Sequence, residues 1–243
     1  MNPDWLIPDW PAPANVRAFV TTRAGGVSEG AYASMNLGMQ CGDDPANVAR
    51  NRLIVGEHLP QLPGWLAQCH GVDVLDLDRE GATDRTADAA VTTKTGRVSG
   101  VLTADCLPVL LCNDDGTRIG IAHAGWRGMA AGVIENTAGA LRADRGDVLA
   151  WLGPAIGPDA FEVGPEVREA FMAVDAAAGS AFRPYRAGKY LADLYALARQ
   201  RLARAGVTRV FGGGFCTLGD SRRFFSYRRE KQSGRMGSFI WMA

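Results

Sequence analysis

The chain contains 243 residues, of which 47% are hydrophobic and 21% are charged, as in an ordinary soluble globular protein with a substantial core. Lysine plus arginine equals aspartate plus glutamate at 26 each, so the formal net charge is zero and gives no argument for binding nucleic acid or an anionic membrane surface. No apolar stretch approaches the roughly 20 residues that span a bilayer.

The five cysteines are odd in number and lack the regular spacing of a disulfide framework. The first residues show no charged segment followed by an apolar run, which a secretory signal requires. We therefore expect a cytoplasmic protein, because a reducing compartment keeps thiols free to bind a metal.

The amino-terminal half predicts short strands around one helix. After an irregular lead-in of 15 residues, Val16–Thr22 predicts a strand, and Arg23–Ser28 predicts a turn because its two glycines accept positive φ. Asp44–His58 predicts a helix that begins at an Asp-Pro pair. Four further strands are expected at Val72–Leu77, Ala87–Thr93, Gly100–Cys112 and Arg118–His123.

The carboxyl-terminal half mixes helices with further strands. Helices are predicted over Trp126–Arg142, Pro165–Ala177 and Tyr190–Ala205. Strands are predicted over Asp147–Leu152, Val207–Phe211, Phe224–Arg228 and Gly237–Met242. The predicted strands and helices do not alternate regularly as βαβ units, which favours an α+β fold. We expect a single compact domain over residues 1–243, in which mixed β-sheets are layered with helices.

Two histidines and one cysteine stand in short glycine- or proline-bearing motifs, at Gln68–Gly71, Thr103–Pro108 and His123–Gly128. Each motif lies where a predicted strand begins, breaks or ends, which is where sites are usually built. Two imidazoles and one thiol, without a fourth protein ligand, are typical of a catalytic zinc site whose open position takes water or substrate. The pattern therefore predicts a metal site, and the catalytic centre, at His70, Cys106 and His123.

Other interpretations use the same residues. Taken singly, a buried free cysteine is more often a small apolar side chain, and a lone histidine is more often hydrogen-bonded than metallated. A cysteine hydrolase would use Cys106 as nucleophile and His70 or His123 as base. A non-catalytic binding module would tolerate substitution of His70 and Cys106. Asp105, beside Cys106, is a candidate both for orienting an imidazole and for transferring protons.

Ordered motifs over most of the chain resemble those of the YfiH-like family, also called laccase-domain or polyphenol-oxidase-like proteins. The motifs are Thr22–Ser28, Asn36–Gly38, Asn51–Arg52, Gln68–Gly71, Ala87–Ala89, Asp105–Pro108, His123–Gly128, Gly153–Pro158, Phe161–Val163, Cys216–Thr217 and Phe224–Arg229. Their order along the chain is far more specific than any one of them.

The resemblance implies a metal on His70, Cys106 and His123, usually zinc, with copper as the alternative. It also implies purine nucleoside chemistry: phosphorolysis of adenosine, inosine and S-methyl-5'-thioadenosine, and deamination of adenosine. The expected partners are then purine nucleosides and phosphate, with no nucleic acid and no membrane, while the oligomeric state is open. A peptidoglycan-editing role has been attributed to one branch of the family.

Phosphorolysis requires a cationic pocket, and arginine binds phosphate through two parallel hydrogen bonds. The candidate phosphate-binding residues are Arg127, Arg52, Arg23 and Arg228. Arg127 is favoured because it opens a predicted helix, whose first turn attracts anions. Phe224, Phe225 and Tyr227 could stack on a purine, although such a run is more typical of a strand in the core.

Copper-dependent oxidation of phenols is the alternative activity. A four-electron laccase needs a blue-copper site and a histidine-rich trinuclear cluster, and three histidines cannot supply both. A single copper ion on two histidines and one cysteine would support at most weak oxidation of phenols.

Overall fold

The computed structural model describes residues 4–79, 85–141 and 147–243. Its largest sheet runs in the order β11-β7-β5-β6-β3-β2 and is mixed, since β2 is parallel to β3 and β11 to β7 while the other pairs are antiparallel. Its strands are β2 Val74–Asp76, β3 Ala89–Thr92, β5 Leu107–Asn113, β6 Ile119–Ala124, β7 Val148–Leu152 and β11 Arg209–Gly212.

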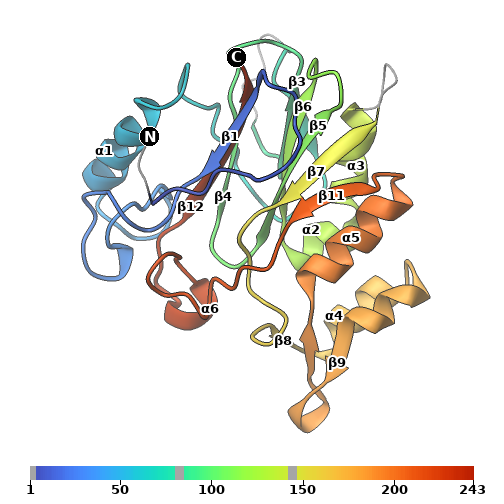
Figure 1. The fold of residues 1–243 in the computed structure, drawn as a ribbon. Coiled ribbons are helices and arrows are strands. Elements are labelled where there is room, and N and C mark those ends of the chain that lie inside the picture. Colours follow the sequence, from blue (N-terminus) through green and yellow to red (C-terminus); the bar gives the residue numbers. More distant parts are fainter. Residues whose placement is uncertain (1–3, 80–84, 142–146) are drawn as a thin grey trace.

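Two smaller sheets accompany it in the described part of the chain. One is antiparallel, in the order β1-β12-β4, with β1 Val16–Val20, β12 Met236–Met242 and β4 Ser99–Thr103. The other, in the order β8-β10-β9, contains β8 Glu162–Val163, β10 Tyr190–Ala192 and β9 Phe182–Pro184. This last sheet lies beside α4, apart from the other two (Figure 1).

The α-helices of the described residues are α1 Pro45–Gly56, α2 Trp126–Ala131, α3 Val133–Leu141, α4 Pro165–Met172, α5 Leu194–Arg204 and α6 Tyr227–Glu230. Short 3-10 segments occupy Gly30–Tyr32, Ala176–Ala181 and Arg186–Gly188. No helix among these is both long and apolar enough to cross a membrane.

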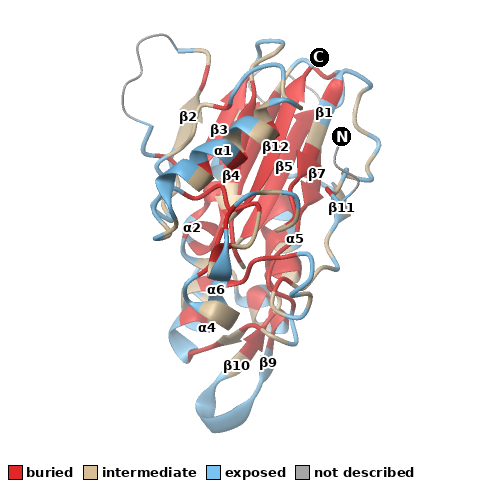
Figure 2. Ribbon diagram, turned by 90° about the vertical axis from the view of Figure 1, so that its left-hand side faces the viewer, coloured by how far each residue is buried: buried red, intermediate tan, exposed pale blue. Residues whose placement is uncertain are grey.

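The two larger sheets pack face to face between layers of helices (Figure 1). The side chains of β5 alternate between the two cores that result, since Val109 faces the helices α2, α3 and α5, whereas Leu110 faces β1, β4 and β12. On the outer face of the sheet β1-β12-β4, α1 packs Val55 against Phe19 and Phe239. The central strands are buried throughout (Figure 2). This architecture confirms the predicted mixed sheets layered with helices.

The predicted strand Gly100–Cys112 is wrong as a single element. It forms β4 and β5, which belong to different sheets, and the chain changes direction between them at Asp105, whose φ is +80°. The proline at 108 follows this break directly, as its presence in a strand sequence suggested.

Other elements also differ from the prediction. The predicted helix Trp126–Arg142 is two helices, because Gly132 adopts a φ of +111° that ends α2; Arg142 lies outside the described residues. Tyr190 belongs to β10, and α5 begins only after Asp193, whose side chain accepts from the amide of Ala196. The segment predicted as strand Phe224–Arg228 instead leads into α6, which Ser226 caps.

Candidate metal centre

The three predicted ligands meet at one end of the large sheet. β6 ends next to His123 and β5 begins next to Cys106, and the two strands pair antiparallel, with Pro108 opposite His123. The ligand atoms of His70, Cys106 and His123 all lie within 4.8 Å of one another. Nε2 of His70 is 3.8 Å from Sγ of Cys106, and the centroids of the two imidazole rings are 4.8 Å apart.

Exposure is graded across the cluster. His123 is buried, Cys106 is partly buried and His70 is exposed. The cluster is therefore fixed in the protein on the side of His123 and reaches solvent on the side of His70. A small molecule can approach from the latter side, as a catalytic rather than a purely structural metal site requires.

One carboxylate, that of Asp88, holds both histidine-bearing segments. Its Oδ1 lies 2.7 Å from Nδ1 of His123 and accepts from the amide of His70 at 2.9 Å. Its Oδ2 accepts from the amides of Cys69 at 3.0 Å and Gly71 at 2.6 Å. These bonds stabilise the left-handed conformation of His70, whose φ is +62°. They also orient His123 with its other ring nitrogen free for a ligand.

Sequence reasoning missed this role of Asp88, although the residue stood within a recognised motif. The usable signal was a charged residue at the start of the apolar run Ala87–Thr93. An aspartate there is fully buried, and a buried carboxylate requires partners.

The electrostatics of the cluster favour a thiolate and an imidazolium in the absence of metal. Burial opposes both charges, but the charge and hydrogen bond of His123, with a further contribution from His70, lower the pKa of Cys106 to about 6. Burial likewise opposes protonation of His123, but Cys106 and Asp88 raise its pKa to about 9. Against the effect of burial, hydrogen bonds from His123, Gly71 and Cys69 hold the pKa of Asp88 well below its usual range.

Two glycines of the His123–Gly128 motif let the segments approach. A Cβ on Gly125 would stand 2.9 Å from Cδ2 of His70 and 3.0 Å from Sγ of Cys106. A Cβ on Gly128 would stand 2.6 Å from the carbonyl oxygen of Gly71. The first glycine leaves room beside the ligands, and the second brings α2 against the loop that carries His70.

The loop of His70 is also anchored to the sheet β1-β12-β4. The side chain of Gln68 donates to the carbonyl of Leu102 at 2.9 Å and accepts from its amide at 2.8 Å. This paired bond fixes Gln68 to β4 as a neighbouring strand would. The Gln68–Gly71 motif thus combines one anchor, one exposed ligand and one glycine that donates to Asp88.

The donor set fits zinc. Bond lengths of about 2.3 Å to sulfur and about 2.0–2.1 Å to nitrogen place the two ligand atoms about 3.5 Å apart in a tetrahedral site. The 3.8 Å between His70 and Cys106 is close to that separation. The same trio, two imidazoles and a thiolate, also suits copper. Cys106 beside two imidazoles has the geometry of an activated nucleophile as well.

The sequence suggested that Asp105 orients an imidazole, but in the structure Asp88 has this role. The carboxylate of Asp105 accepts from the hydroxyl of Thr217 through Oδ1 and from the amide of Arg228 through Oδ2, both at 2.6 Å. Its carbonyl accepts from the amide of Ile156. Asp105 therefore connects the strand break beside Cys106 to the carboxyl-terminal part of the chain.

The four candidate phosphate-binding arginines fall into two groups. Arg23 and Arg52 are engaged by the protein: Arg23 donates to the carbonyls of Ala33 and Ser221, and Arg52 donates twice to the carbonyl of Leu37. Arg52 also stacks 4.0 Å from the ring centroid of Trp65, and burial lowers its pKa. Both are thus held as structural cations.

Arg127 and Arg228 are exposed. The guanidinium of Arg127 lies 4.5 Å from the ring centroid of Trp126, and among the described residues it has no hydrogen-bonding or ionic partner. Arg228 donates through Nη1 to the carbonyl of Glu162 at 2.7 Å, and its guanidinium makes no other hydrogen bond to the residues that the structure describes. Arg127 shares a motif with the ligand His123, and the amide of Arg228 is bonded to Asp105, the neighbour of the ligand Cys106.

The carboxyl-terminal aromatic residues divide as core and surface. Phe224 and Phe225 are completely buried and pack with Met236, so the core interpretation is confirmed for them. Tyr227 is half exposed. Among the other cysteines, Cys112 is buried in the core, and Cys69 is exposed with its thiol 3.3 Å from Asp88.

A family model described as multi-copper polyphenol oxidoreductase laccase matches residues 17–243. A protein of Escherichia coli named purine nucleoside phosphorylase YfiH is 55% identical over 239 residues, which cover 98% of each chain. A protein of Pseudomonas aeruginosa, also named a purine nucleoside phosphorylase, is 53% identical with the same coverage.

Solved structures agree with the fold. A protein of Neisseria meningitidis superposes with a TM-score of 0.94 at 48% identity, covering 98% of this chain and 99% of its own. YlmD of Geobacillus stearothermophilus superposes with a TM-score of 0.91 at 31% identity, covering 100% and 97%.

Proposed function

This chain belongs to the multi-copper polyphenol oxidoreductase laccase family, and from that premise we propose that it is a zinc-dependent purine nucleoside phosphorylase. The observation that carries the proposal is the convergence of His70, Cys106 and His123 in a chain 55% identical to a relative with that name. Adenosine, inosine and S-methyl-5'-thioadenosine are the proposed substrates, and deamination of adenosine is a proposed second activity.

His70, Cys106 and His123 would hold the metal, and when bound there zinc would supply Lewis-acid activation of water or of the purine base. The chain itself supplies the preorganisation. Asp88 fixes the ring of His123 and the loop of His70 at once, so the donor atoms need little rearrangement. His70, as the exposed member, lies on the side from which a nucleoside would enter.

Phosphorolysis joins a phosphate oxygen to C1' of the sugar as the bond from C1' to the purine breaks, and the purine leaves with the bonding electrons and takes up a proton. The chain must therefore hold a phosphate anion near the cluster. Arg127 and Arg228 are proposed for this, because both residues are exposed and, within the described part of the chain, their guanidinium groups keep donors without a partner. Arg23 and Arg52 are poorer candidates, since backbone carbonyls already occupy them.

Asp105 is proposed to serve the same site. Both of its carboxylate oxygens accept hydrogen bonds from the chain, which favours holding the loop of Cys106 over carrying a proton. A water attacking C6 of adenosine would need a proton acceptor other than His123, whose two ring nitrogens would face Asp88 and the metal.

The test combines metal analysis with a nucleoside screen. Zinc-loaded protein incubated with adenosine or inosine should release free purine only when phosphate is present, and should form inosine from adenosine without it. Both products are separated by chromatography. No purine product at any phosphate concentration would refute the proposal.

Oxidation of phenols with copper is the second candidate, and the donor set favours it only as a weak activity. A hydrolase that uses Cys106 as nucleophile is the third. Chelation separates it from the metal enzyme: a chelator should abolish nucleoside turnover, whereas alkylation of metal-free protein would be needed to stop a hydrolase.

A further inference from the structure

The strand break beside Cys106 is held by residues from the far end of the chain. Asp105 has a φ of +80°, a left-handed conformation that a non-glycine residue adopts only when its surroundings fix it. The hydroxyl of Thr217 and the amide of Arg228 donate to its two carboxylate oxygens. Cys106 follows directly, with its sulfur 3.8 Å from Nε2 of His70.

Thr217 is itself fixed. Its side chain is completely buried, and its amide donates to the carbonyl of Ala155 at 3.0 Å. Its carbonyl accepts from Nη1 of Arg229 at 2.8 Å. Ala155 precedes Ile156, whose amide donates to the carbonyl of Asp105. Side chain and main chain of Asp105 are therefore tied to one rigid group of residues.

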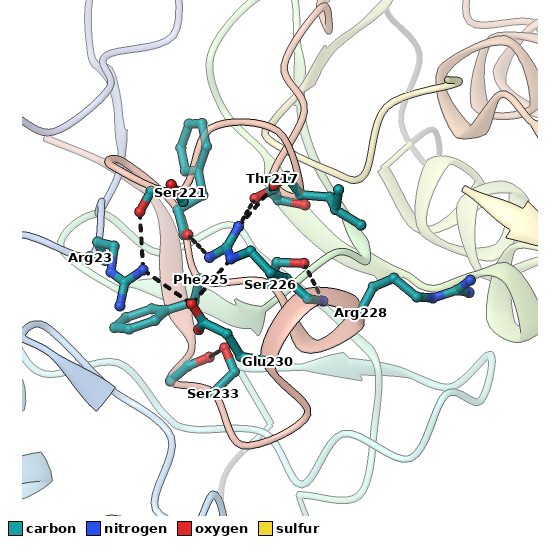
Figure 3. A network of polar contacts seen from close by, with 12 residues as sticks. Arg23, Thr217, Ser221, Phe225, Ser226, Arg228, Glu230 and Ser233 are labelled. Carbon is teal, nitrogen blue, oxygen red and sulfur yellow. Dashed lines mark hydrogen bonds and ion pairs between the residues drawn. The ribbon is translucent and has the colours of Figure 1, made fainter. Parts of the chain in front are cut away.

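Arg229 carries this support further. Figure 3 shows Thr217, Glu230 and Arg23, which this network of polar contacts includes. Besides Thr217, the Arg229 guanidinium donates to the carbonyls of Leu218 and Phe224, and it pairs with Glu230 at 3.1 Å. Arg23 lies 3.6 Å from the same carboxylate of Glu230 and donates to the carbonyl of Ser221. The network so connects the amino-terminal motif of Arg23 to the loop of Cys106.

We propose that Asp105 and Thr217 are positioning residues that set the Cys106 thiolate opposite the two imidazoles. Asp105 acts through the main chain of Cys106, and Thr217 acts through the carboxylate of Asp105. The inference rests on the proposed function in that Cys106 is taken as a metal ligand. It also links residues of the motifs Thr22–Ser28, Cys216–Thr217 and Phe224–Arg229 to the position of Cys106, through the contacts of Arg23, Thr217 and Arg229.

A proton-carrying Asp105 makes a different prediction. If the carboxylate worked on substrate, its loss would abolish turnover without moving Cys106, and removal of the Thr217 hydroxyl would leave metal binding unchanged. If Asp105 positions Cys106, both substitutions weaken the same metal–thiolate contact, and the second adds little once the first has been made.

The experiment titrates metal-free protein with Co²⁺ alone and follows the absorption band that arises from cysteine bound to cobalt. The variants are Thr217→Val, Asp105→Asn, their combination, and Thr217→Ser, which keeps the hydroxyl. Thr93→Val is the matched control, because the exposed Thr93 donates to the carboxylate of Asp78 at 2.7 Å on another part of the molecule. Thermal melts establish that each variant is folded.

We expect Thr217→Val and Asp105→Asn each to weaken Co²⁺ binding by about 10–100-fold and to alter the cysteine band. Thr217→Ser should restore both, Thr93→Val should change neither, and the double variant should resemble the single ones. Wild-type Co²⁺ binding in Thr217→Val or in Asp105→Asn would overturn the positioning role. Losses that multiply in the double variant would overturn it too.

These readings are independent of nucleoside turnover. If wild-type protein binds Co²⁺ through Cys106 but cleaves no nucleoside, the proposed function fails while the positioning role stands. If nucleosides are cleaved and the Thr217→Val spectrum is unchanged, the function stands and the positioning role fails.

Discussion

Oδ1 of Asp88 lies 2.7 Å from Nδ1 of His123, and the carboxylate also accepts from the amides of the loop that carries His70. One buried anion thus sets the relative position of two ligands from separate parts of the chain. An ionised carboxylate has no proton to donate and can only accept hydrogen bonds. Nδ1 of His123 therefore carries the proton, and Nε2 is left for the metal.

Substitution Asp88→Asn tests this relationship. The amide nitrogen of asparagine cannot accept from backbone N–H groups, so the loop of His70 should loosen and the His123 ring should lose its orientation. We expect zinc affinity to fall by about 10–100-fold. Competition with a chromophoric chelator measures the affinity. Asp78→Asn is the control, since Asp78 accepts from Thr92 and Thr93 at the end of β3 away from the histidines. Undiminished affinity in Asp88→Asn would contradict the relationship.

The ligand set itself predicts about one zinc per chain. His70→Ala, Cys106→Ala and His123→Ala should each lose the metal, because two remaining ligands hold zinc poorly. Elemental analysis by mass spectrometry measures the content. His58→Ala is a matched control, since that histidine packs edge-on against Trp5 in a different part of the fold. Full zinc content in two of the three ligand variants would rule out the assignment.

The sequence was sufficient to predict that His70, Cys106 and His123 come together, because each stood in a short motif at the end of a strand. It was insufficient for Asp88, whose role depends on the antiparallel pairing of β3 with β6 that brings it opposite His123. The partners of Asp105 were equally hidden, since Thr217 and Arg228 reach it from the other end of the chain. Contacts between distant segments leave no local pattern.

The prediction of helices and strands from the sequence was limited in the same way. The layered α+β class followed from the order of apolar segments, and the helix start at Asp44 followed from its capping chemistry. The break at Asp105 and the end of α2 at Gly132 were missed, because apolar residues continue on both sides of each. Tyr190 was assigned to a helix because its pairing with β8 and β9 is non-local.

Substitution Arg127→Ala tests the phosphate site. The loss of a charged hydrogen-bond donor, which contributes about 1.5–3 kcal/mol, should raise the KM for phosphate by about tenfold or more while zinc content stays normal. Deamination of adenosine should change little because it uses no phosphate. Steady-state kinetics at varied phosphate measure both. Equal loss of the two activities would point to a structural role for Arg127.

Arg52→Ala is the matched comparison. Its guanidinium serves the carbonyl of Leu37 and the face of Trp65, so the variant should lose about 1–3 kcal/mol of stability with little change in the KM for phosphate. Urea denaturation measures the stability. A raised phosphate KM in a folded Arg52→Ala protein would contradict this assignment.

The pKa of Cys106 predicts a pH profile for metal-free protein. Because this pKa is lowered to about 6, the thiolate should already dominate at pH 7, and alkylation by iodoacetamide should rise through pH 6 and level off before pH 8. Cys112 is the internal comparison: burial raises its pKa to about 12, and it should stay unmodified over this range. Peptide mass spectrometry reports both. A midpoint for Cys106 near its ordinary value of 9.0 would contradict the thiolate–imidazolium pair.

Metal exchange separates the nucleoside enzyme from the oxidase. Zinc has no redox chemistry, so zinc-loaded protein should act on adenosine and leave phenols unoxidised. Copper on the same two histidines and one cysteine should oxidise phenols only slowly, because three histidines in the whole chain cannot build a four-electron cluster. Nucleoside turnover should therefore follow zinc occupancy, and phenol oxidation should follow added copper. His123→Ala should abolish both, since both depend on one site. Fast phenol oxidation by protein as purified, with no purine released from adenosine or inosine, would instead identify the chain as an oxidase.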